Sequence, residues 1–421
     1  MNDLRAMLVI ARRELVERVK SKLFLGITLL GPIGMVAMVL VPVLLANNGA
    51  GTKVEIVDKS GVLAPLMVRD LEQIGWKPST VDPGVLEQDD DAIKQLELHR
   101  IRDQQINGFI TVPRDGVDTG LIVYRGDNGS NTIVQARLAI LVAGVVHEER
   151  GKRAGIAKAT LDKLIELPPF RPLQTSGESE GASGVASYFL GYLLAYVLML
   201  VIMLYAVGVM RSVVQEKTSR VMELMVATIK PRSLMTGKII GVGVAGLIQI
   251  VVWLLMGAIT LAYRDEILGL FGKSSDGAPL PPLTAGVVTI ALLFFILGYF
   301  FYASMYAAVG AMVSSEQDTQ QVQMPITLLL VIGFACVSMV SGDPRGLTAT
   351  IVTMLPFWSA LLMPMRYLLG AASVLEVAIS LAILLGSTVL IARAAAKIYR
   401  VGVLMYGKRP GVRELLRWLR Y

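Results

Sequence analysis

Long runs of apolar residues recur along the chain and are separated by polar segments. A membrane-spanning helix needs about 20 consecutive apolar residues, and all but one of the runs approach or exceed that length. We therefore predict an α-helical membrane protein, with transmembrane helix 1 in 23–46 and helices 2–6 within 184–400. The six predicted spans follow the apolar runs Leu23–Ala46, Val185–Met210, Ile239–Ala262, Leu283–Val313, Met324–Val340 and Val374–Ala396.

Between the last two runs, the apolar stretch Ile351–Leu369 is interrupted by Pro356 and Pro364. Proline inside a helix removes a backbone hydrogen bond and clashes with the preceding turn. We expect an outer re-entrant segment over 343–370 rather than a further span. Arg366, near its end, is expected to reach the lipid headgroups with its charged tip.

Residues 1–22 place apolar and charged positions on opposite sides of a helix, with several Lys and Arg residues on the charged side. Such a helix lies in the membrane interface, and its charge predicts a cytoplasmic N-terminus. The basic tail 401–421 is predicted to be cytoplasmic too. It is expected to lie against the membrane or a partner protein.

Residues 47–183 have a different composition, richer in charged and turn residues. Strand-like runs at Lys53–Val57, Gly108–Val112 and Leu121–Tyr124 alternate with helical stretches. This alternation predicts an α/β extracytoplasmic domain inserted between the first and second transmembrane helices.

Composition agrees with a membrane protein, since 54% of residues are hydrophobic and only 17% are charged. Soluble domains carry about a quarter charged residues. The net charge of +7 raises nucleic acid as a partner. However, the basic residues lie beside the apolar runs, as the positive-inside rule requires. We expect a multi-pass plasma-membrane protein with both termini cytoplasmic and no nucleic-acid partner.

Sequence signatures of catalysis are missing. A P-loop needs two glycines at fixed spacing before Lys-Ser, and Gly272-Lys273-Ser274 is preceded by Ile267 where the first glycine belongs. The two histidines, His99 and His147, lack the helical spacing of a zinc protease. We therefore expect no enzyme activity, no catalytic residue, no metal and no cofactor bound by this chain.

Segment 211–230 is predicted to be a cytoplasmic helix. Glu216, Arg220 and Glu223 would share one face of it, in i,i+4 and i,i+3 pairs, with Lys217 beside them. Two interpretations stay open at this point: a solvated face with ordinary ion pairs, or a coupling helix that docks on a soluble partner.

Four stretches resemble the permease subunits of ABC transporters of the type-2 exporter superfamily. They are the E-K-x-S-R-x-x-E-L pattern from Glu216, followed by L-x-x-G-K-I-I-G from Leu234, and then Gly310–Pro325, Leu355–Arg366 and Ala396–Gly407. The last stretch resembles the sodium-extrusion (NatB-like) branch, which also has a large domain after its first span.

The resemblance implies an exporter subunit that works as a homodimer or heterodimer. Separate ABC-type ATPase subunits would use the ATP and dock on the residues Glu216–Glu223 and on a short polar turn at 314–323, near Gln317 and Asp318. It also implies export of sodium ions, whereas a Met- and aromatic-rich interior fits a hydrophobic compound equally well. The alternative is a membrane signalling or mechanotransmission protein whose outer domain senses or delivers a ligand.

Polar side chains inside the predicted spans are costly and therefore informative. They form stripes at helical spacing on the second and fourth spans, with one further amide in the third span after the small residues Gly237 and Gly241. We expect them either to pack between helices or to line a subunit interface and translocation path. The candidate path residues are Tyr192, Tyr196, Gln249, Tyr299, Tyr302 and Tyr306.

Overall fold

The computed structural model forms two compact units, which we describe separately. The helical unit comprises Met1–Ala37 with Arg171–Tyr421, and the α/β unit comprises Met38–Phe170. The structure describes residues 3–45, 51–87, 89–119, 121–127, 132–165, 174–175, 180–181, 184–219, 229–263, 266–267, 269, 284–313, 315–403 and 405.

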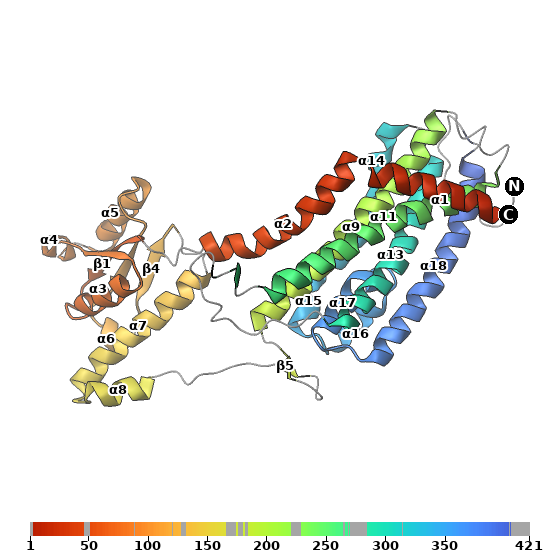
Figure 1. Ribbon diagram of the computed structural model, residues 1–421. Helices are drawn as coiled ribbons and strands as arrows, with labels where there is room; N and C mark the ends of the chain where they lie inside the picture. The colour runs from red at the N-terminus through yellow and green to blue at the C-terminus, as the bar shows by residue number, and fades with distance from the viewer. Residues whose placement is uncertain are drawn as a thin grey trace. The chain divides into compact units, whose positions relative to one another are not determined.

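The helical unit is a bundle in which α13 packs against both α9 and α18, while α1 lies along α11 (Figure 1). Helix α2, Lys22–Leu45, begins in this unit, and a short antiparallel pair joins β5, Gln174–Thr175, to β6, Glu180–Gly181. The other helices are α1 (Asp3–Val19), α9 (Gly184–Thr218), α11 (Pro231–Ala262), α13 (Ala285–Met312), α14 (Glu316–Ala335), α15 (Val337–Gly342), α16 (Leu347–Met354), α17 (Ser359–Leu368) and α18 (Val374–Gly402).

Among the described residues, five helices are long and apolar enough to cross a membrane. They lie within Tyr188–Thr218, Pro231–Ala262, Ala285–Met312, Gln317–Gly342 and Val374–Gly402. The first predicted span falls on α2, whose described apolar part is the shorter stretch Lys22–Gly34. The chain is thus a multi-pass membrane protein with five helices suited to cross the membrane, and the predicted sixth crossing stays a prediction.

Two helix boundaries differ from the sequence prediction. Helix α9 continues past Arg211 to Thr218 and has 35 residues, a length of about 50 Å that exceeds a hydrocarbon core of about 30 Å. The first part of the predicted coupling segment 211–230 is therefore the end of a span rather than a separate helix. Residues expected to form a polar turn at 314–323 instead open α14, where the Ser315 side chain accepts a hydrogen bond from the Asp318 amide.

The segment interrupted by prolines folds as two short helices, α16 and α17, with a break at Leu355–Trp358. Arg366 of α17 does not reach toward headgroups, because its side chain is only 2% exposed. Its guanidinium donates to the Pro344 carbonyl at 2.6 Å, to Thr350 Oγ1 at 2.9 Å and to Glu376 Oε1 at 3.0 Å. Arg366 therefore ties α17 to the start of α18.

The α/β unit is built on a sheet with strand order β2-β1-β3-β4, in which β4 alone is antiparallel to its neighbour. Strands β1 and β3 lie on two of the predicted runs, whereas β4 begins two residues after the start of the third run and shares Val123 and Tyr124 with it. The unit contains β1 (Lys53–Asp58), α3 (Ala64–Gln73), β2 (Lys77–Thr80), α4 (Pro83–Leu86), α5 (Asp90–Arg102), β3 (Gly108–Val112), α6 (Gly116–Thr119), β4 (Val123–Gly126), α7 (Thr132–Arg153) and α8 (Lys158–Ile165).

A buried acidic pair lies between α5 and β1 in this unit. Glu97 is 0% exposed, and Glu55 next to it is 5% exposed. Arg100 forms ion pairs with both carboxylates. Burial, followed by the negative charge of Glu55, raises the pKa of Glu97 to about 7. A neutral carboxyl is thus favoured at this position.

The raised pKa predicts a pH-dependent stability for α5. The folded-state pKa of Glu97 exceeds its unfolded value of about 4.5. Its contribution to the stability of the fold is therefore complete below pH ~4.5 and disappears as the pH rises through about 7. The variant E97Q does not titrate. We expect hydrogen exchange in α5 to be about tenfold slower in E97Q than in the wild type at pH 8, and similar in both at pH 5.

The exposed Glu72 of α3 provides a matched control. Each variant is compared with the wild type at the same pH, so the intrinsic exchange rates cancel. E72Q should exchange like the wild type at pH 5 and at pH 8. An E97Q-to-wild-type ratio that is the same at pH 5 and pH 8 would contradict the assignment.

Candidate functional site

Four polar side chains from three helices meet at one end of the bundle, and we call them the Lys238 clasp: Glu14, Ser212, Glu216 and Lys238. Lys238 of α11 is 0% exposed. Its Nζ lies 2.6 Å from Glu14 Oε1, 2.7 Å from Glu216 Oε1 and 2.7 Å from Ser212 Oγ. A buried cation requires such partners, so the clasp joins α1 and the end of α9 to the start of α11.

Glycines on α11 let α1 come close enough for this contact. An added Cβ at Gly237 would lie 2.8 Å from the Met7 carbonyl oxygen, and one at Gly241 would lie 2.4 Å from that of Ala11. Both distances are too short for a side chain. Helix α1 therefore packs on α11 backbone to backbone, as small-residue stripes permit in membranes.

The side chains of α1 differ in whether they are buried. The apolar side chains Leu4 and Leu8 are 61% and 55% exposed, while Ala6, Ile10 and Glu14 are buried. Ile10 and Glu14 are the side chains of α1 that lie against Gly237 and Gly241 of α11. The exposed leucines are available for contact with lipid, which fits the expected position of α1 in the membrane interface.

Replacing Gly241 by valine is expected to separate α1 from α11. Overpacking costs about 1–3 kcal/mol or more, and here the blocking atom is a backbone oxygen that cannot rotate away. We expect hydrogen exchange of α1 to accelerate about tenfold or more in G241V. On the same helix, Gly257 has open space around it, so G257V should leave α1 unchanged. Equal exchange in the two variants would argue against close packing of these helices.

Lys217 forms a second buried contact at the same end of α9. It is 1% exposed, and its Nζ donates to the carbonyls of Ala311 at 2.6 Å and Gly402 at 2.8 Å. These carbonyls belong to the last turns of α13 and α18, where helices leave acceptors unsatisfied and favour cations. Lys217 thus holds three helix ends together.

The predicted coupling residues have different environments. The side chains of Glu216 and Lys217 turn inward, into the clasp and the α13–α18 ends, and so are engaged within the chain. Arg220 and Glu223 lie outside the described residues. Gln317 is exposed and Asp318 half-buried in the first turn of α14. Their coupling role stays a prediction.

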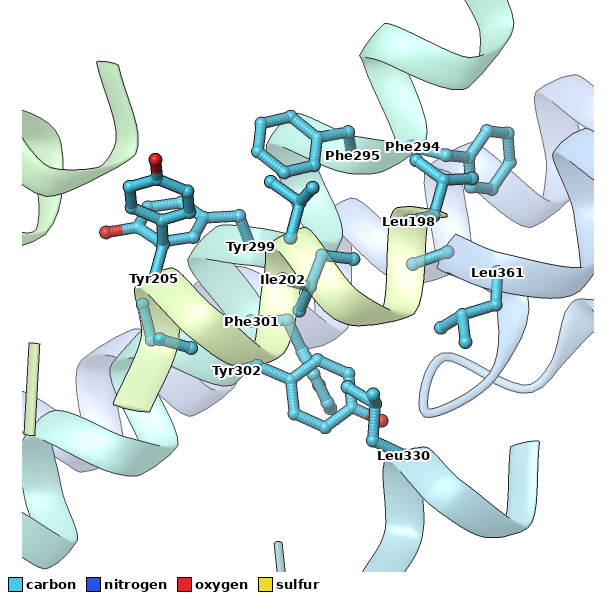
Figure 2. Packing of buried hydrophobic residues seen from close by; sticks show 14 of the residues in the cluster. Leu198, Ile202, Tyr205, Phe294, Phe295, Tyr299, Phe301, Tyr302, Leu330 and Leu361 are labelled. Atoms are coloured by element: carbon cyan, nitrogen blue, oxygen red, sulfur yellow. The ribbon is translucent and has the colours of Figure 1, made fainter. Parts of the chain in front are cut away.

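The tyrosines of α13 lie in the core of a single chain, not on its surface. Tyr299, Tyr302 and Tyr306 are at most 1% exposed. Tyr299 donates to the Ile239 carbonyl, Tyr302 to the Phe357 carbonyl, and the Tyr306 hydroxyl bonds to Thr327. Figure 2 shows Tyr299 on the side of Tyr205 and Tyr302 on the side of Leu330.

The remaining path candidates are on α9 and α11. Tyr192 and Tyr196 are half-buried and place their rings 4.9 and 5.8 Å from that of Phe334 in α14. Gln249 is 0% exposed and accepts a hydrogen bond from the Tyr205 hydroxyl. All six side chains are packed between helices, and a translocation path through them stays a prediction.

Sequence reasoning missed the partners that complete the clasp. Glu14 was assigned no role, and Ser212 appeared only as part of the segment after the second span. The pattern around Lys238 carried a signal, because a lysine between glycines at the start of a long apolar helix needs a counter-charge. Nothing local in the sequence indicates which acidic residue provides it.

The long apolar helices are typical of a multi-pass membrane protein, and comparison with known proteins identifies its family. A family model described as ABC-2 family transporter protein matches residues 22–397. The chain belongs to this family, whose members are membrane components and imply an ATPase partner.

Two relatives are similar over most of their length. The uncharacterized protein YhaP of Bacillus subtilis is 26% identical over 385 residues, which cover 90% of this chain and 89% of that protein. The uncharacterized protein MJ1024 of Methanocaldococcus jannaschii is 23% identical over 426 residues, covering 99% and 96%. No solved structure matches the chain.

Proposed function

We propose that the chain is the membrane-spanning subunit of an ATP-driven exporter, working as a dimer with a separate ATPase. The observation that carries this proposal is the family match across residues 22–397, which covers four of the five long apolar helices and residues 374–397 of the fifth. The ATPase hydrolyses ATP, and this chain provides the path through the membrane.

The proposed topology adds α2 as a first crossing to the five clear ones. Six crossings place both termini on one side, and the basic residues at the N-terminus assign that side to the cytoplasm. The α/β unit, between the first and second crossings, is then extracytoplasmic. The Lys238 clasp falls on the cytoplasmic side, near the ends of α9 and α11.

Coupling to the ATPase would use the segment 211–230, with Arg220 and Glu223, and the start of α14 at Gln317 and Asp318. The clasp supports this proposal because it connects the end of α9 to α1 and α11. A push on the segment would therefore move several helices together. ATP drives such a change only by binding one conformation better than the other.

Two substrate classes fit the proposal, sodium ions and hydrophobic compounds. The sodium assignment rests on the resemblance to the sodium-extrusion branch. The buried interior is aromatic and apolar, with scattered hydroxyls such as those of Tyr302 and Tyr306, and this favours a hydrophobic compound.

The test is flux into inverted vesicles that contain this chain and the ABC-type ATPase that co-purifies with it. Radioactive sodium and a hydrophobic cationic dye serve as probes. We expect ATP-dependent uptake of one probe, and R220A/E223A should reduce it about tenfold or more while the chain still inserts normally. Absence of any ATPase that co-purifies with the wild-type chain would contradict the proposal.

A further inference from the structure

The sheet of the α/β unit changes its winding direction between two neighbouring strands. From β1 the chain proceeds to β2 on one side, and it then crosses to β3 on the other side of β1. All three strands are parallel, so the carboxyl ends of β1 and β3 lie at the same edge. In open α/β sheets, ligands bind in the crevice outside the carboxyl ends at such a switch point.

The two faces of this sheet are covered by different helices. Ile56 and Ile110 belong to a core formed with α3 and α7. Val57 and Phe109 point to the other face, where Ile93 of α5 packs on them. The β3–β4 register puts Phe109 opposite Arg125, so Arg125 shares this second face with α5.

A cavity of about 180 Å³ opens on the second face, beside the first turns of α5. A single water needs about 10–15 Å³, so the cavity admits a small organic molecule. Val57 is part of its wall, and the polar lining comes from α5, which contributes Asp90, Asp91 and Lys94, and from the strands, which contribute Thr111 and Arg125. The cavity therefore lies at the winding switch between β1 and β3.

Among the cationic side chains of the lining, Arg125 is held in place by its neighbours. The guanidinium of Arg125 lies 5.7 Å from the centroid of the Phe109 ring, over its face. Its Nη1 is 3.4 Å from Thr111 Oγ1. A stacked guanidinium of this kind presents its edge in a fixed plane, which suits a carboxylate.

The acidic part of the lining is divided between two residues. Asp90 forms an ion pair with Lys59, so its charge is matched within the chain. Asp91 is exposed at the cavity, one residue further along α5. The cavity thus presents the Asp91 carboxylate beside Lys94 on α5, and the Arg125 guanidinium on the strand side.

We propose that this cavity binds a small zwitterion, a free amino acid, with its carboxylate at Arg125 and Thr111 and its ammonium at Asp91. A simple anion would be repelled by Asp91, and a simple cation by Arg125 and Lys94. A molecule with both charges satisfies both sides. Val57 and Ile93 provide an apolar floor for a short side chain.

The test is equilibrium dialysis of the full chain in lipid nanodiscs against a mixture of radiolabelled L-amino acids. We expect saturable binding at one site per chain. D91N and R125Q should each weaken it about tenfold or more. The controls D103N and R102Q remove the same charges at the far end of α5, from exposed positions, and should bind like the wild type.

Asp91 is exposed, so D91N keeps the fold intact, and hydrogen exchange of α3 checks this for every variant. Two results would overturn the proposal: no saturable binding of the mixture up to about 10 mM, or binding that D91N and R125Q leave unchanged. Binding of inorganic phosphate in place of the amino acids, with D91N unaffected, would show a simple anion site and overturn it as well.

Discussion

Replacing Lys238 by methionine is expected to lower the unfolding temperature of the helical unit by about 10 °C. The methionine fills a similar volume but leaves the carboxylates of Glu14 and Glu216 facing each other with no cation between them. Removal of one partner from a buried ion pair costs about 3–5 kcal/mol. Thermal unfolding of the detergent-solubilised chain, followed by circular dichroism, measures the change.

A variant with the whole clasp neutralised separates charge from packing. In E14Q/K238M/E216Q no charge remains in the clasp, so most of the lost stability should return. The matched control is K230Q, because Lys230 forms an ion pair with Asp3 in which the two side chains are 72% and 53% exposed. Such pairs contribute about 0–1 kcal/mol. If K238M unfolds at the same temperature as K230Q, the clasp has no structural importance.

Substitution of Arg366 by methionine should loosen the short helices α16 and α17. The guanidinium bonds to Pro344, Thr350 and Glu376 at once, and R366M leaves all three acceptors without this donor. Loss of a buried charged hydrogen-bond donor costs about 3 kcal/mol or more. We therefore expect hydrogen exchange across 347–368 to accelerate about a hundredfold, measured by mass spectrometry on the full chain.

Two further arginine substitutions test whether loss of the Arg366 guanidinium causes the faster exchange. R366K retains the charge but not the planar fork that reaches several acceptors, so it should give an intermediate acceleration. R393M removes an exposed arginine of α18 and should change nothing in α16 or α17. Exchange in R366M that matches R393M would show that Arg366 does not hold this segment.

The length and periodicity of apolar runs were enough to predict most elements. Five long helices fall on predicted spans, β1 and β3 fall on predicted strands, and β4 overlaps a third. Strand β2, Lys77–Thr80, was missed because its sequence Lys-Pro-Ser-Thr has no apolar alternation. It forms a strand through its pairing with β1, a tertiary interaction that no local pattern encodes.

The Lys238 clasp shows that local patterns also fail to indicate tertiary contacts in the candidate site. Lys238 was recognised within a family pattern, yet its partner Glu14 is 224 positions away in the chain. The amphipathic pattern of α1 did not indicate that Ile10 and Glu14 lie against Gly237 and Gly241 of α11. Periodicity shows which residues could share a face. It does not show which face meets a neighbour whose surface is bare backbone.

One ammonium group bridging two helix ends has a mechanical consequence. Lys217 bonds to carbonyls of Ala311 and Gly402, which are 94 and 185 positions away from it. Any movement that separates the end of α9 from the end of α13 or α18 would leave the Lys217 ammonium buried without its hydrogen-bond acceptors. The ends of α9, α13 and α18 therefore move together, and any rearrangement of the bundle must bend these helices elsewhere along their length.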